Sequence, residues 1–132
     1  MVSFKKVRPL IACPLHILVK ACKHCVSLTR CHVGAAKAIF NRARLFVSPH
    51  GALCVNMAFM PFGGHLFEIR PRGYRNACFH HLAEVCELQY YLVLGNGTFV
   101  SKIDVDVPPV VKTLRMIKKR MDEEDRGVET NE

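Results

Sequence analysis

The spacing of the apolar side chains changes several times along this chain, and this limits the possible folds more than any other feature. From about residue 27 to residue 47 they recur every three or four positions, which predicts a helix capped by Ser27. Across residues 53–59 and 66–70 they alternate, which predicts two strands joined through a Gly-Gly turn. The helical spacing returns at residues 78–86, where a second helix is expected.

The two ends of the chain complete this series. Residues 9–20 form a short apolar run with β-branched residues, which predicts a first strand. Residues 90–94, YYLVL, predict a buried strand, and an Asn-Gly pair leads from it into an alternating segment at 99–107, so a second hairpin is expected. A last amphipathic helix is predicted at 110–121. The acidic tail at 122–132 is predicted to be disordered.

The resulting order is strand, helix, strand, strand, helix, strand, which is the split βαβ arrangement of ferredoxin-like domains. We therefore expect a two-layer α+β sandwich over residues 1–121, with an extra C-terminal hairpin strand and a terminal helix. A length of 132 residues suits one domain with a real core.

Positive charge dominates most of the chain. There are 19 Lys and Arg against 11 Asp and Glu, a net charge of +8, and Glu68 is the only acidic residue before Glu84. Such a field favours anionic partners, nucleic acid or acidic protein surfaces, and says nothing about the fold.

The loop RPRGYRN places Arg70, Arg72 and Arg75 around Tyr74. Guanidinium groups beside an aromatic ring suit phosphate groups and unpaired bases, so these arginines are candidates for binding nucleic acid or another anionic partner. The alternative interpretation is a solvated connection before a helix. No RNA-binding sheet motif with alternating aromatic residues is present to decide between them.

The cysteines raise the question of zinc. Cys22 and Cys25 have the two-residue gap that lets two thiolates reach one tetrahedral ion. The further candidate ligands are Cys31 or His32 and Cys54 or Cys13. No second C-x-x-C pair follows, and free cysteine is also a common buried residue. The preferred interpretation therefore has no cofactor, and zinc at Cys22, Cys25, Cys31 and Cys54 is the alternative. Seven cysteines without a disulfide-like framework favour a reducing compartment.

Catalytic motifs are missing from the sequence. There is no G-x-S-x-G, no P-loop and no H-E-x-x-H. The adjacent His80 and His81 are expected to diverge on a helix, with Glu84 as a surface contact of His80. We therefore expect a protein that is not an enzyme. No apolar run approaches the roughly 18 residues of a membrane helix, so no membrane partner is expected.

A set of short features follows a familiar order between Val33 and Val110. They are Gly51-Ala52, Pro61, Gly63 or Gly64, Leu66-Phe67, Ala77-Cys78 and Leu82 in the second helix, and Ile103-Asp104 in the last strand. In this order the chain resembles the adenovirus early-region-four protein family of open reading frame three. A second, cysteine-rich early-region-four protein has a similar run, here Phe59-Met60 and His65-Leu66.

The first resemblance implies a viral early protein of the host nucleus that forms dimers or higher oligomers. It further implies that the protein captures host nuclear proteins and so counters antiviral and DNA-damage responses. The second resemblance implies zinc and recruitment of a ubiquitin ligase. The rival hypothesis, which comes from the residues alone, is a zinc-containing basic RNA-binding module that suppresses silencing or host defence.

Overall fold

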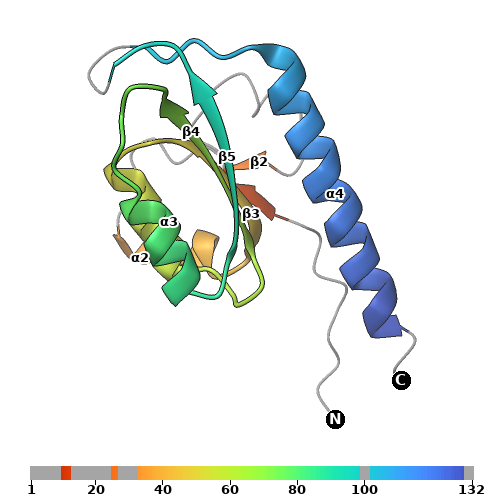
Figure 1. Cartoon of the computed structure of the whole chain (residues 1–132). Coiled ribbons are helices and arrows are strands. Elements are labelled where there is room, and N and C mark those ends of the chain that lie inside the picture. Colours follow the sequence, from red (N-terminus) through yellow and green to blue (C-terminus); the bar gives the residue numbers. More distant parts are fainter. Residues whose placement is uncertain (1–9, 13–24, 27–32, 99–101, 130–132) are drawn as a thin grey trace.

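The computed structural model describes residues 10–12, 25–26, 33–98 and 102–129 (Figure 1). In chain order the elements are β1 (Leu10–Ala12), β2 (Cys25–Val26), α2 (Val33–Phe40), β3 (Ala43–Pro49), the 3-10 helix η1 (Ala52–Phe59), β4 (His65–Pro71), α3 (Cys78–Val85), β5 (Gln89–Gly95) and α4 (Val107–Glu129). The strands form one sheet in the order β2-β1-β3-β4-β5, and every neighbouring pair is parallel. The prediction of a mixed helix and strand protein is confirmed.

The finer prediction of a ferredoxin-like sandwich is not confirmed. That arrangement has an antiparallel sheet, whereas the described strands pair only in parallel. Parallel neighbours need a crossover between them, and η1 and α3 provide the crossovers from β3 to β4 and from β4 to β5. The strand order 2-1-3-4-5 is the one found in flavodoxin-like sheets.

The strand predicted at residues 53–59 is wrong, because this segment is η1. Its buried side chains are Cys54 and Met57, and Met60 continues the series. A spacing of three is the period of a 3-10 helix. Val55, which an alternating strand would place beside Leu53 and Met57, is 55% exposed.

The helix predicted up to residue 47 ends at Phe40, and β3 begins at Ala43. Leu45, Phe46 and Val47 are all buried, because helices cover both faces of this part of the sheet. A parallel strand covered on both sides reads as a continuous apolar run without alternation. The predicted cap Ser27 and most of the predicted first strand lie outside the described residues, and Leu10–Ala12 are its described part.

The second predicted hairpin is reduced, in its described part, to a single pair of residues. After β5 the chain makes an isolated antiparallel bridge between Asn96 and Asp104, and α4 starts at Val107. The terminal helix is longer than predicted, because α4 continues to Glu129 through residues expected to be disordered. The predicted strands at 66–70 and 90–94 and the predicted helix at 78–86 are confirmed by β4, β5 and α3. The predicted burial of residues 90–94 is wrong, because β5 is at the edge of the sheet and only Val93 of these five is buried.

Helices lie on both sides of the sheet (Figure 1). The first apolar core joins α2, η1 and α3 to one face, with Phe40, Phe46 and Met57 fully buried. The second joins α4 to the other face, where Ile117 and Met121 pack against Phe67 and its neighbours. Among the described helices none is long and apolar enough to cross a membrane.

Candidate functional site

The carboxyl ends of β3, β4 and β5 lie together and are held by backbone hydrogen bonds. The His50 amide donates to the Ile69 carbonyl at 2.8 Å, and the Arg72 amide donates to the Gly95 carbonyl at 2.8 Å. Open parallel sheets bind their ligands outside this edge. A ligand-binding site is therefore expected at this edge.

A hollow of about 230 Å³ lies between the loop after β4 and the turn after β5. It is lined by Pro71, Gly73, Tyr74, Gly97 and Thr98. Gly97 has a φ of 132°, and a Cβ at this position would lie 2.3 Å from the Lys102 carbonyl oxygen. The shape of this wall therefore requires glycine.

The three arginines predicted from the sequence do not share one role. Arg72 and Arg75 are exposed on the loop whose Gly73 and Tyr74 line the hollow, but neither arginine is itself a lining residue. Arg70 is half-buried, and its Nη1 donates to the Asn76 carbonyl at 2.7 Å. It therefore holds the loop in place and offers less of its charge to a partner.

Beneath this edge lies a buried carboxylate that the sequence analysis did not single out. Glu68 of β4 is fully buried, His50 Nδ1 contacts one of its oxygens, and the Tyr90 hydroxyl donates to the other. Burying a carboxyl group costs free energy unless it has hydrogen-bond partners, and His50 and Tyr90 offset this cost for Glu68. Burial and the bond to Glu68 raise the pKa of Tyr90, which keeps this hydroxyl a donor.

His50 connects the buried carboxylate to the loop. Its ring packs against Tyr74 with 4.6 Å between centroids and against Phe79 with 4.8 Å. Since Tyr74 lines the hollow, a buried imidazole–carboxylate pair lies directly behind that wall. The pair fixes the position of Tyr74 from inside the protein.

The environment of Cys54, the fourth candidate ligand, argues against the cysteine zinc site. Cys54 is fully buried in η1, its thiol donates to the Pro49 carbonyl at 3.6 Å, and burial raises its pKa to about 11. Zinc binds the thiolate, so a thiol held protonated is a poor ligand. Cys25 lies in β2, and Cys22 and Cys31 lie outside the described residues.

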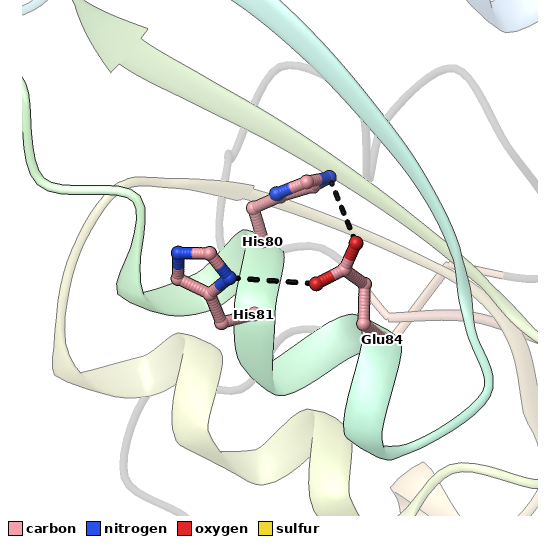
Figure 2. Close-up of side chains that lie close together, drawn as sticks. All are labelled: His80, His81 and Glu84. Carbon is pink, nitrogen blue, oxygen red and sulfur yellow. Dashed lines mark hydrogen bonds and ion pairs between the residues drawn. The ribbon is translucent and has the colours of Figure 1, made fainter.

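A different group of side chains could hold a metal ion. One donor atom from each of His80, His81 and Glu84 on α3 lies within 4.8 Å of the other two (Figure 2). The predicted divergence of the two histidines is wrong, because both reach the same carboxylate, His80 Nε2 at 3.8 Å and His81 Nδ1 at 3.4 Å. The i,i+4 contact of His80 with Glu84 is confirmed.

Comparison with known proteins gives no family for this chain. No protein-family model matches it, and no curated protein matches it either. The described residues offer three candidate sites: a hollow at the carboxyl edge, a buried imidazole–carboxylate pair behind it and a His-His-Glu group on α3.

Proposed function

We propose that this chain is a non-enzymatic regulatory protein that self-associates and binds other proteins. The observation that carries the proposal is the outer edge of β5 together with two exposed apolar side chains near its start, Phe62 and Val85. We also propose that it is a viral protein of the host nucleus and that it sequesters host nuclear proteins. This part of the proposal rests on the adenovirus resemblance alone.

The strand edge supplies main-chain hydrogen-bonding groups. β5 is the last strand of the described sheet, so along Gln89–Gly95 one side of its backbone has no strand partner in that part of the chain. An unpaired edge is a template on which a strand of another chain can add. Leu94, 38% exposed, provides apolar surface near the end of this strand.

Two large apolar side chains extend this surface at the amino end of β5. Phe62 is 78% exposed and Val85 is 79% exposed. The Gly63 amide donates to the Glu87 carbonyl at 2.9 Å, which ties the loop carrying Phe62 to the segment that follows Val85. Exposed apolar groups that are held on a rigid frame are typical of protein interfaces.

The first partner in this proposal is a second copy of the chain. A two-fold axis would bring two β5 edges together, each presenting the same groups to the other, which is the symmetry of most protein dimers. Addition of a strand from a different protein uses the same groups, so self-association and partner binding compete for one edge.

Light scattering on the full chain across a concentration series tests this proposal. Phe62→Lys/Val85→Lys should raise the dimer dissociation constant at least tenfold, about 1.4 kcal/mol, because charged side chains would have to be buried in the interface. Met116→Lys on α4, the same kind of change at one side chain that is 52% exposed, is the control and should leave self-association intact.

A wild-type chain that stays monomeric throughout the series would contradict the proposal. So would equal weakening by Met116→Lys. The binding of other proteins is tested by affinity capture from host nuclear extract. The wild-type chain and the Met116→Lys control should retain nuclear proteins, and the double variant should not.

The carboxyl-edge hollow favours a second candidate, the basic RNA-binding module. Arg72 and Arg75 are exposed beside Tyr74, which gives two cations and a ring for phosphates and a base. Arg72→Gln/Arg75→Gln should weaken RNA binding and lower the salt dependence by about one counterion for each arginine. Arg42→Gln, an exposed arginine between α2 and β3, is the control.

The zinc half of this second candidate has its own measurement. Metal analysis of the purified chain should find one zinc equivalent that is lost with Cys22→Ser if the cysteine set binds it. RNA binding that is insensitive to salt and to both arginines would remove the second candidate altogether.

A further inference from the structure

The exposed side of α3 carries a group of donors that neither candidate function uses. Figure 2 shows His80, His81 and Glu84 close together on α3. Their side chains are 43%, 73% and 62% exposed. We propose that these three residues bind a divalent transition-metal ion such as Zn²⁺, with a fourth coordination position open to water.

The donor chemistry fits this class of ion. Two imidazole nitrogens and one carboxylate are the ligand set of three-residue zinc sites that keep an open position. Nitrogen and oxygen donors together suit Zn²⁺ and its neighbours, whereas Ca²⁺ and Mg²⁺ prefer oxygen alone. The set contains no cysteine, so it differs from the cysteine ligands considered from the sequence.

The distances also fit. Tetrahedral zinc with bonds of roughly 2.0 to 2.2 Å separates its donor atoms by about 3.4 Å. The two histidine nitrogens already lie 3.4 and 3.8 Å from oxygens of the Glu84 carboxylate. Since all three donors fall within 4.8 Å of one another, small side-chain rotations bring them around one ion.

One ligand is held in place by the interior. The His80 ring packs on Tyr90 with 4.8 Å between centroids, and the Tyr90 hydroxyl is bound to the buried Glu68. Groups behind a ligand that fix its orientation raise the affinity of a metal site. His81 and Glu84 are free to adjust because they are exposed, so the site combines a fixed ligand with two adaptable ones.

Titration of the full chain with Zn²⁺ tests the proposal. His81→Asn and Glu84→Gln should each raise the dissociation constant of one Zn²⁺ equivalent at least tenfold. Mutation of a residue that only supports a metal ligand already lowers metal affinity by about that factor. Glu87→Gln removes the same charge three residues after Glu84, outside the group, and should leave binding unchanged. The ligands are exposed, so the metal-free variants should melt as the wild type does.

Co²⁺ in place of Zn²⁺ identifies the donors, because cobalt bound by thiolates shows charge-transfer bands that nitrogen and oxygen ligands do not give. The Co²⁺ that binds to the wild type but not to His81→Asn or Glu84→Gln should lack these bands. It should also broaden the imidazole proton resonances of His80 and His81. Zn²⁺ binding unchanged in both variants, or a single bound Co²⁺ with thiolate bands only, would overturn the proposal.

Discussion

The Tyr90 hydroxyl donates a hydrogen bond to the carboxylate of Glu68, and both groups lie between the sheet and its covering helices. The carboxylate is fully buried and shares its other oxygen with His50. In surroundings of low polarity a partly satisfied network costs more than an apolar core, so each member depends on the others.

We expect Tyr90→Phe to destabilise the fold by about 1 to 3 kcal/mol, because it leaves one oxygen of a buried carboxylate without its donor. Urea unfolding of Tyr90→Phe, Glu68→Gln and the double variant forms a double-mutant cycle. Coupling of roughly 0.5 kcal/mol or more is expected if the bond is real. Additive effects would mean that the two side chains do not interact.

We expect His65 to make the stability of the protein depend on pH. It is fully buried in β4, with Nδ1 at 3.2 Å from the Tyr91 hydroxyl and Nε2 at 3.4 Å from Glu124. Burial lowers the pKa of His65 below its ordinary value of 6.5, and this outweighs the opposing effect of the Glu124 carboxylate. The folded state therefore binds fewer protons than the unfolded state between the lowered pKa and 6.5.

The free energy of unfolding should consequently fall as the pH drops below about 6.5, by at most 1.4 kcal/mol per pH unit for this one group. Urea unfolding at pH 7.5 and 5.5 measures the slope. His65→Gln should flatten it, and His81→Gln, an exposed histidine on the other side of the sheet, is the control. An identical slope in His65→Gln would assign the pH dependence to other groups.

Segments with a simple pattern bounded by turn residues were predicted correctly. The apolar stripe of α3, the alternation in β4 and the short apolar run of β5 were each recognised, and all three elements are confirmed. β3 is covered on both faces, and its residues continue the helical spacing of α2, so helix and strand were merged. In η1 the apolar residues alternate in the sequence, but one of them, Val55, is exposed. The buried residues recur every three positions, and this period cannot be read from the sequence alone.

The candidate site residues were only partly predictable. The exposure of Arg72 and Arg75 could be expected because a cluster of charge in a loop is visible in the sequence, whereas the contact of Arg70 with the Asn76 carbonyl could not. Glu68 could have been noticed as a lone acid inside an apolar strand. Its partner Tyr90 is 22 residues away, and that contact follows only from the parallel register of β4 and β5.

Gly95 fixes how the chain leaves β5. A Cβ at this position would lie 2.5 Å from Ile103 Cγ2 and 2.7 Å from the Asp104 carbonyl oxygen, so backbone would have to move. Gly95→Ala should cost about 1 to 3 kcal/mol and weaken the bridge between Asn96 and Asp104. Hydrogen exchange of the Asn96 and Asp104 amides measures this effect, and Gly73→Ala, with open space around its Cβ, is the control.

Cys54 and Cys78 should differ strongly in reactivity. Cys54 is buried, and its pKa is raised from 9.0 to about 11, which lowers its thiolate fraction near neutral pH about a hundredfold. Cys78 is exposed at the start of α3. Alkylation of the folded protein with iodoacetamide, followed by mass spectrometry, should modify Cys78 first and Cys54 at least about a hundred times more slowly. Labelling in urea should remove the difference, because unfolding exposes both thiols. Comparable rates in the folded state would mean that Cys54 is accessible as a thiolate, and would return it to the candidate zinc ligands.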